Sequence, residues 1–435
     1  MRPFRETVHV AFMSGFVGET RSMPVTRVAV GVLLTFALLG FYLQISFGLP
    51  FSLHYLSGLL LFVTLIPRAN DLWFASTICL LSLASIFWFI FSPSLAGYLP
   101  EQLTSYVQLV LAITSSIGVF RSLQMVGRLN PAGLSRTALW IFVLMSLGIA
   151  LEVAGPLRPV SDAIRGAIYD FGLYSNDTRD IGSYGWIRPK LFTSEPSHLG
   201  KFYGLCLFMA VACSPKLRFQ VWLLLISLPF IILVRSPAVL PGLMCTCALV
   251  TLRIGPRRIL LNPFILVMLV VFCGFFVYEI VETIRTRLIQ TMDPSLYIRL
   301  VRPFQLVLRT IEARPLLGYG IGSDRQIAGL FEEISTSANA PVYLRREIGT
   351  TNRAWGASHF ALFIQLGAIG GLIWITAIAR FVRSVLEGYM SIFWLFFVSF
   401  GFFIGVINTP FYWGQLAIFL SGLWLADQYR KKEPV

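Results

Sequence analysis

The stretch that decides the fold is 28-VAVGVLLTFALLGFYLQISF-47, a predominantly apolar run without a single charged side chain. About 20 residues of this kind are needed for a helix to cross the hydrocarbon core of a bilayer. The run is longer than the apolar core of a signal peptide, and no obvious small-residue cleavage site accompanies it. We therefore predict a membrane-spanning helix that remains in the mature protein.

Comparable runs follow along the rest of the chain. Together with the first run they number about twelve, which predicts an all-α, polytopic integral membrane protein with about twelve transmembrane helices. The further runs are Phe51–Ile66, Leu72–Phe91, Leu103–Phe120, Ala138–Ala154, Leu199–Cys213, Phe219–Val234, Ala238–Leu252, Phe264–Val281, Phe360–Ala379, Ser391–Ile407 and Phe411–Ala426.

The composition agrees with lipid as the surrounding solvent. Of the 435 residues, 56% are hydrophobic and 13% are charged, whereas a soluble domain carries about 25% charged residues. Such a chain has too little polar surface to cover the several cores that a soluble protein of this length would contain. A soluble enzyme and a nucleic-acid binder are thereby excluded, despite the net charge of +14.

The arginine and lysine residues in the short connections predict which side of the membrane each connection faces. Positively charged loops stay on the cytoplasmic side, and alternate short connections carry these residues. Both termini are basic as well, so we predict that both are cytoplasmic. The basic connections contain Arg68; Arg121, Arg128 and Arg136; Lys216 and Arg218; Arg253, Arg257 and Arg258; and Arg380 and Arg383.

Two connections are much longer than the others, and both are predicted on the outer side. Loops of such length in a compact protein are usually functional or disordered. They divide the chain into residues 1–155, with a cytoplasmic lead and five transmembrane helices; 156–198, the first large loop; 199–281, with helices six to nine; 282–358, the second, arginine-rich loop; and 359–435, with the last three helices and a cytoplasmic tail.

Arginine is concentrated in the second loop, where the bias against outer positive charge would not place it. Guanidinium groups bind phosphate bidentately, so an outer cluster can hold a pyrophosphate and neutralise a departing diphosphate. The alternative is that several of these side chains pair with acidic residues of the loop or with lipid headgroups. The arginines are Arg285, Arg287, Arg299, Arg302, Arg309, Arg314, Arg325, Arg345, Arg346 and Arg353.

The second loop also contains apolar residues at helical spacing. They predict helical stretches over Ile284–Gln290 and Tyr297–Ala313, with an interfacial helix in the second that Pro315 stops. The glycine-rich segment Pro315–Gly322 follows. No strand precedes it, so we expect an ordered turn packed on the bundle rather than a phosphate-binding loop.

The first loop ends in 186-WIRPKLFTSEPSH-198, immediately before a membrane helix. Pro196 suits the first turn of that helix, with Ser194 or Glu195 near its cap. Glu195 is then either a residue that pairs with the helix dipole or a partly dehydrated base that accepts a proton from a sugar hydroxyl. Glu152 lies near a predicted span end, where an interfacial position is expected.

His359 begins the helix that follows the second loop. A lone histidine is more often structural, but histidine is also the commonest general acid or base. The predicted location of His359 at the same outer mouth as Arg188 and Glu195 favours a functional role. The six cysteines lie in or beside apolar runs without zinc-ligand spacing, so we expect no metal site.

In their order along the chain, these residues resemble the bacterial superfamily of O-antigen polymerases and O-antigen ligases. The resemblance extends from Arg188 to the end of the chain, and the polymerase branch is the more similar at the segment around Glu195. The likeness rests on Arg188 and Glu195-Pro196-Ser197, on Arg299, on Arg314–Gly322, and on His359 before Gly367 and Gly370.

The resemblance implies a metal-independent glycosyltransferase that needs no cofactor and faces the periplasm from the bacterial inner membrane. The implied reaction polymerises oligosaccharide repeat units for O-antigen or exopolysaccharide, with undecaprenyl-diphosphate-linked oligosaccharide as the substrate. The implied partners are membrane lipid, a chain-length regulator protein and a flippase, without nucleic acid.

The same resemblance assigns roles to individual residues. Arg188, Glu195 and His359 are the expected catalytic residues. Arg188 is expected to bind the diphosphate, and Glu195 and His359 are the candidates that take the proton of the acceptor. The residues expected to bind the substrate and its diphosphate are Arg299, Arg302, Arg314, Tyr319 and Arg353.

Two other functions stay open. An O-antigen ligase would use the same donor but would transfer the glycan to the lipid A core. A polysaccharide transporter or flippase would carry charged residues inside the helices that line its path, whereas here the ionisable residues collect in the two outer loops.

Overall fold

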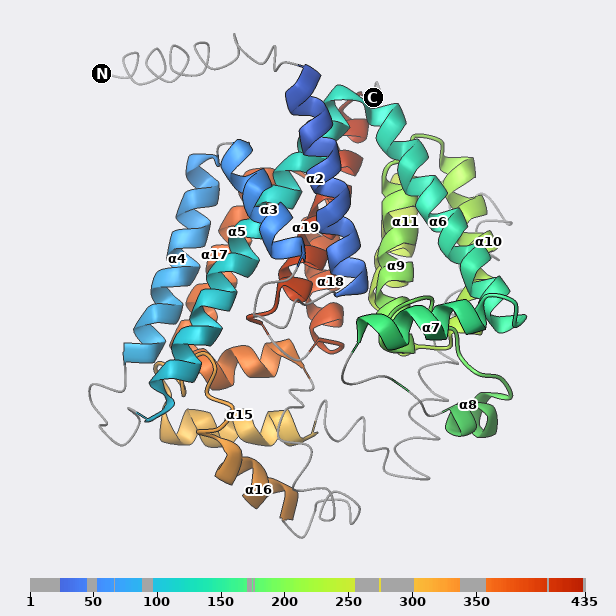
Figure 1. Ribbon diagram of the computed structural model, residues 1–435. Helices are drawn as coiled ribbons and strands as arrows, with labels where there is room; N and C mark the ends of the chain where they lie inside the picture. The colour runs from blue at the N-terminus through green and yellow to red at the C-terminus, as the bar shows by residue number, and fades with distance from the viewer. Residues whose placement is uncertain are drawn as a thin grey trace, which may run out of the picture.

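The computed structural model consists of helices, without strands, in the residues that it describes (Figure 1). These are residues 24–44, 53–65, 67–87, 97–169, 174, 177–254, 274, 301–336, 357–404 and 407–432. The elements are α2 (Pro24–Leu43), α3 (Leu53–Thr64), α4 (Ala69–Ile86), α5 (Leu99–Leu129), α6 (Pro131–Val153), α7 (Arg158–Ile168), α8 (Asp177–Tyr184), α9 (Pro196–Ala212), α10 (Leu217–Val234), the 3₁₀ helix η3 (Pro237–Val239), α11 (Leu240–Ile254), α15 (Arg302–Ala313), α16 (Ala328–Thr336), α17 (Ser358–Val385), α18 (Met390–Gly401) and α19 (Pro410–Lys432).

Within the described residues, six helical segments are long and apolar enough to cross a membrane, which confirms an all-α protein with transmembrane character. They are α4, α5, α6, α10, α17 and the continuous segment of η3 and α11. Every predicted apolar run that falls within the described residues overlaps a helix. The run Phe264–Val281, apart from Gly274, and the predicted helical stretch Ile284–Gln290 lie outside them. The number of twelve spans therefore stays a prediction.

Prolines and polar caps set several helix boundaries. Between α5 and α6, Asn130 accepts a hydrogen bond at its Oδ1 from the N–H of Gly133 at 2.8 Å, and Pro131 occupies the first helical position. Proline is tolerated there because the first N–H groups of a helix have no intrahelical partner. At the start of α9, Pro196 is the first residue and Glu195 is the N-cap, which confirms the predicted boundary.

The helices surround one large apolar core, in which α5 packs against α3, α4 and α19. Glycines permit the close approach of α3 and α5, because a Cβ on Gly118 would collide with the backbone of Gly58. A buried ion pair joins α4 to α5, in which Nε of Arg121 donates to Oδ2 of Asp71 at 2.8 Å.

α17 is interrupted at Gly367, whose backbone angles (φ 68°, ψ −176°) are not helical. The turn that follows α15 pairs with this break. The N–H of Tyr319 donates to the carbonyl oxygen of Ile364 at 3.0 Å, and the N–H of Ala368 donates to that of Pro315 at 2.8 Å. The prediction of an ordered turn packed on the bundle is thus confirmed, and the glycines serve backbone-to-backbone packing.

A second, smaller apolar cluster connects α15 and α16 to the first part of α17. α15 ends at Ala313, just before Pro315, which confirms the predicted end of this helix. The buried members of the cluster are Leu306, Val307, Ile327, Phe331, Ile334, Ala361 and Ile364.

The described parts of both long loops lie at one end of the bundle (Figure 1). α7 and α8 of the first loop are there, together with α15 and α16 of the second, whereas α2 begins and α19 ends at the opposite end. α7, α8 and α16 were not predicted from the sequence. The polar segment that leads into α9 lies at the same end as these four helices.

Candidate functional site

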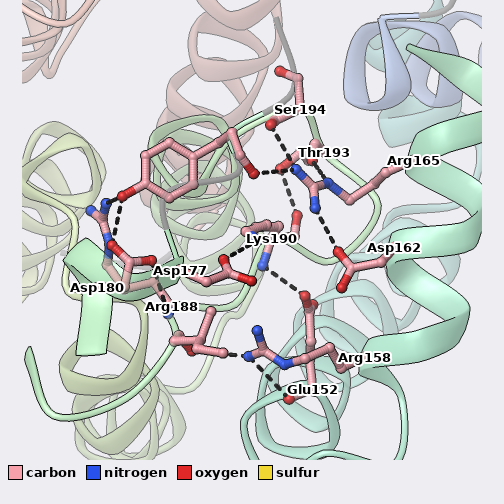
Figure 2. A network of polar contacts seen from close by, with 12 residues as sticks. Glu152, Arg158, Asp162, Arg165, Asp177, Asp180, Arg188, Lys190, Thr193 and Ser194 are labelled. Atoms are coloured by element: carbon pink, nitrogen blue, oxygen red, sulfur yellow. Dashed lines mark hydrogen bonds and ion pairs between the residues drawn. The ribbon is translucent and has the colours of Figure 1, made fainter. Parts of the chain in front are cut away.

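The polar segment 186–198, which follows α8 and includes the first turn of α9, is held by three buried charged side chains (Figure 2). Glu152 comes from α6, Arg165 from α7 and Asp180 from α8, and each binds a different part of the segment. The conformation of the segment therefore depends on contacts with residues that are distant in the sequence.

Arg165 binds the part of the segment that leads into α9. Its Nε donates to the carbonyl oxygen of Thr193 at 2.8 Å, and its Nη2 donates to that of Ser194 at 3.0 Å. Nη2 also donates to the carbonyl oxygen of Tyr174 at 3.2 Å, and Nη1 donates to Oδ1 of Asp162 at 2.7 Å. One buried guanidinium thus donates to three backbone acceptors, of which that of Ser194 also accepts from the Tyr174 N–H, and those of Thr193 and Tyr174 would be costly to leave unpaired.

Glu152 binds the middle of the segment from the last turn of α6. Its Oε1 accepts a hydrogen bond from the N–H of Lys190 at 3.1 Å, and its Oε2 accepts one from that of Leu191 at 2.6 Å. Leu191 and Phe192 have φ values of 39° and 67°, a conformation that costs about 1–3 kcal/mol for each non-glycine residue. Glu152 lies near the end of α6, as expected, and its carboxylate is fully buried in the protein, where it holds this strained backbone.

Arg188 is fixed by Asp180 and two tyrosines. Its Nε donates to Oδ1 of Asp180 at 2.9 Å, and its Nη2 donates to the Tyr174 hydroxyl at 2.9 Å. Its guanidinium carbon lies 4.8 Å from the centre of the Tyr184 ring. Burial opposes the charge of Arg188, but Tyr184 and Asp180 outweigh it and raise the pKa of Arg188. Because these donors are engaged within the protein, the geometry favours a structural role for Arg188 over direct contact with a diphosphate.

Tyrosines tie the same network to its surroundings. The hydroxyl of Tyr174 donates to Oδ1 of Asp180 at 2.6 Å, and burial together with this bond raises the pKa of Tyr174. The hydroxyl of Tyr169 donates to the carbonyl oxygen of Leu43, at the end of α2, at 2.6 Å. Burial raises the pKa of Tyr169 to about 12, so the phenol keeps its proton and remains a donor at neutral pH.

Glu195 and His198 form a pair at the start of α9. Oε1 of Glu195 lies 3.4 Å from Nε2 of His198. The Ser197 hydroxyl donates to the same carboxylate oxygen, and the Ser194 hydroxyl is hydrogen-bonded to Nδ1 of His198 at 2.8 Å. The Glu195 side chain is 41% exposed, so a ligand can reach it. A carboxylate beside an imidazole in this arrangement can take up and release a proton.

Lys201 lies one helical turn after His198. It is buried, and its Nζ lies 5.2 Å from the centre of the Phe411 ring at the start of α19. The His198 ring contacts the same phenylalanine, with 5.2 Å between ring centres. Neither His198 nor Lys201 is among the predicted site residues, although their spacing of three residues from Glu195 and from each other places them on one side of a helix.

His359 lies in the first turn of α17 and packs against α18. Its Nε2 lies 2.9 Å from the carbonyl oxygen of Val398, and its ring centre lies 5.1 Å from that of Phe397. A carbonyl oxygen only accepts, so Nε2 carries the proton and Nδ1 is the acceptor nitrogen of the neutral ring. The adjacent Ser358 donates to the carbonyl oxygen of Gly401 at 3.3 Å. These contacts favour a packing role for His359 between the two helices.

The described arginines predicted to bind the diphosphate stack on aromatic rings. The guanidinium carbon of Arg302 lies 4.6 Å from the ring centre of Phe331, and that of Arg314 lies 4.7 Å from that of Tyr319. Arg302 is buried. The structure brings Arg314 and Tyr319 together, and these residues belong to the group of α15, α16 and α17. The predicted binding residues Arg299 and Arg353 lie outside the described residues.

The two most exposed arginines in the described part of the second loop pair with acids. Nη1 of Arg309 lies 3.6 Å from Oε2 of Glu312, and its Nη2 lies 3.7 Å from Oε1 of Glu333. Nη1 of Arg325 lies 2.7 Å from Oε1 of Glu101 in α5. For these two side chains, the alternative interpretation, in which outer arginines form ion pairs, holds.

The chain matches no family model, no curated protein and no solved structure. Among the described side chains, no group of three or more His, Cys, Asp and Glu residues could hold a metal ion. A function must therefore be argued from the geometry of the site itself.

Proposed function

We propose that this protein is a membrane glycosyltransferase that polymerises undecaprenyl-diphosphate-linked oligosaccharide repeat units. In this proposal about twelve helices cross the bacterial inner membrane, and the end that carries α7, α8, α15 and α16 faces the periplasm. The observation that carries the proposal is the Glu195–His198 pair, with the Lys201 ammonium on the next turn of α9. The resemblance to the O-antigen polymerase and ligase superfamily supplies the substrate class.

The location of the pair suits a lipid-linked substrate. Glu195 is partly exposed at the N-cap of α9, whereas Lys201 is buried farther along the helix. A substrate anchored by its lipid chain holds its diphosphate at the membrane boundary, with the sugars in water. A proton acceptor at the mouth of a helix and a cation one or two turns deeper match this order of groups.

The proposed reaction needs a base for the acceptor and a cation for the leaving group. Glu195, assisted by His198, accepts the proton of the acceptor hydroxyl. The acceptor oxygen then forms a bond to the anomeric carbon of the donor glycan. The bond from that carbon to the diphosphate oxygen breaks, and the electron pair leaves with the diphosphate. Lys201 stabilises the negative charge that develops on this oxygen.

Deletion of the gene distinguishes a polymerase from the ligase and the flippase, the two functions that the sequence left open. In a lipopolysaccharide gel, loss of a polymerase leaves a single repeat unit attached to the lipid A core, whereas loss of a ligase leaves no repeat unit. Loss of a flippase leaves the repeat unit on the cytoplasmic face of the membrane, so the lipid A core carries no repeat unit, as after loss of a ligase. We expect the single-repeat pattern, and unchanged long-chain glycan after deletion would refute the polymerase.

Complementation with variants tests the residues. We expect Glu195→Gln and Lys201→Met to reproduce the deletion pattern at normal abundance in the membrane, because the first removes the base and the second removes the cation. The matched control is Glu332→Gln, which neutralises an exposed carboxylate of α16 at the same end of the bundle and should preserve long chains. Long-chain glycan in cells with Glu195→Gln would contradict the assigned base.

A further inference from the structure

α7 is amphipathic, with a polar face toward the protein and an apolar face outward. A surface helix of a soluble protein has the reverse arrangement. The polar residues Ser161 and Arg165 face the protein and are 0% and 3% exposed, whereas Val160 and Ile164 are 50% and 37% exposed. Asp162, which pairs with Arg165, is exposed outside the apolar face. The exposed apolar residues follow the spacing i, i+3, i+4, i+7 of a single helix face. This face, the α7 stripe, consists of Val160, Ala163, Ile164 and Ala167.

The inward face of α7 is fixed by hydrogen bonds. The Ser161 hydroxyl accepts a hydrogen bond from the N–H of Phe192 at 3.1 Å, and Arg165 donates to the carbonyl oxygens of Thr193 and Ser194. Rotation of α7 about its axis would break these bonds and leave buried polar groups unpaired. The outward orientation of the α7 stripe is therefore enforced by the fold.

α7 lies level with the ends of two apolar helices (Figure 1). It follows α6 after the short connection 154–157, where Gly155 has a φ of 105°. At its other end, the Tyr169 hydroxyl is bonded to the carbonyl oxygen of Leu43, the last residue of α2. Figure 1 shows α7 lying across the lower ends of these helices rather than along them.

The surface next to α7 is apolar and belongs to a spanning helix. α6 is one of the six segments long and apolar enough to cross a membrane, and one side of it is exposed over its length. This side faces lipid when α6 spans the bilayer, because its apolar side chains have no protein cover. It reaches the turn before α7 and consists of Trp140, Leu144, Leu147 and Leu151.

We propose that α7 is a membrane-surface helix whose stripe lies in lipid, at the boundary between acyl chains and headgroups. The stripe continues the lipid-facing side of α6 around the end of the bundle, and helices of this kind bind bilayers through their buried apolar area. Arg165, on the opposite face, holds the backbone that leads into Glu195. α7 therefore sets the depth of that segment relative to the membrane surface. The inference does not depend on which reaction the site performs.

α15 presents a second exposed apolar stripe. Its residues Phe304, Leu308 and Ile311 are exposed at spacings of four and three, while Leu306 and Val307 on its other side are buried against α16 and α17. α15 lies at the same end of the bundle as α7 (Figure 1). Two helices from different loops thus present apolar stripes at the same end of the bundle, with α15 farther from the middle of the bundle than α7.

Photocrosslinking identifies what the α7 stripe touches. A benzophenone amino acid is placed at position 164 of the otherwise native chain, which is purified and reconstituted in nanodiscs of phosphatidylethanolamine and phosphatidylglycerol. The matched control is position 166 of the same helix, because a Cβ at Gly166 meets no atom within 4 Å and lies outside the stripe. Intact-mass spectrometry then measures the fraction of chains that gain the mass of one lipid after irradiation.

We expect severalfold more lipid adduct at position 164 than at position 166. Equal yields at the two positions, or no lipid adduct at position 164, would overturn the proposal. A crosslinked dimer on a denaturing gel would also overturn it, since a second copy of the chain would then cover the stripe. Position 160 repeats the measurement on the same face, so the result does not rest on the folding of one variant.

Discussion

The two loop regions at one end of the bundle are stabilised in different ways. In the first loop, buried charged side chains from three helices hold the backbone of the segment 186–198. In the second loop, an apolar cluster and backbone pairing with the break in α17 hold the chain, and Arg309 and Arg325 form ion pairs at the surface. Among the described residues, charged side chains thus hold the backbone in the first region, whereas in the second Arg309 and Arg325 pair at the surface and Arg302 is buried against Phe331.

This difference follows from what each segment must satisfy. The segment 186–198 begins without regular structure and includes two residues with positive φ, so its N–H and C=O groups need partners from elsewhere. α15 and α16 satisfy most of their own backbone groups, and apolar contacts are enough to dock them. In the first region, buried Arg165 and Glu152 therefore supply partners to an irregular backbone.

The largest expected effect is on the first region, from Arg165→Met. This change retains most of the side-chain volume but leaves the carbonyl oxygens of Thr193 and Tyr174 without their donor, while that of Ser194 keeps only the Tyr174 N–H, and each unpaired group costs about 1–3 kcal/mol. We expect a loss of at least about 2 kcal/mol in the free energy of unfolding, measured by denaturation of the purified protein in detergent. Asp162→Asn is the matched control, because it weakens the ion pair and keeps all three carbonyl contacts. An equal loss in both variants would show that the ion pair, rather than the backbone contacts, stabilises this region.

In the second region, we expect the largest loss of stability from a substitution that disrupts the backbone pairing with α17. Gly318 has a φ of 59°, and a Cβ there would lie 2.6 Å from the Gly367 nitrogen. Gly318→Ala should therefore cost about 1–3 kcal/mol from conformation alone and should detach the turn from α17, seen as faster hydrogen exchange at Tyr319. Gly329→Ala of α16 is the control, since a Cβ there meets no atom within 4 Å. Unchanged exchange in Gly318→Ala would contradict the described docking.

The smallest effect is expected at the surface ion pairs. The Arg325 side chain is 78% exposed and pairs with Glu101. Arg325→Gln should change the free energy of unfolding by less than about 1 kcal/mol, because exposed pairs contribute little and salt screens them. Denaturation at low and high salt measures this contribution. A loss as large as that of Arg165→Met would remove the distinction between the two regions.

The apolar runs predicted the helices because their signal is local. Every predicted run that can be compared overlaps a helix, and both the start of α9 at Pro196 and the end of α15 before Pro315 were predicted from proline. The break in α17 was not predicted. Gly367 lies in an apolar run of ordinary composition, and its conformation depends on the turn from another part of the chain that pairs with it.

The candidate site was predicted only in part. Glu195 was identified because its neighbours Pro196 and Ser197 mark a helix start, but its contacts with His198 and the nearby Lys201 were missed. Arg188 was predicted on the diphosphate, yet the structure engages it with Asp180, which the sequence did not single out. The type of a residue shows which chemistry its side chain can perform. Its contacts in the structure show whether its donors and acceptors are already engaged within the protein.

Hydrophobicity and the distribution of charge by themselves determined that this protein is a helical membrane protein with two long polar connections, because the hydrocarbon core of a bilayer selects apolar runs of a given length. Only the tertiary structure decided which charges are buried, which way α7 faces, and which groups surround Glu195. Those outcomes depend on hydrogen bonds between residues far apart in the chain, such as Glu152 with Leu191 and Arg165 with Thr193, and no local pattern encodes them.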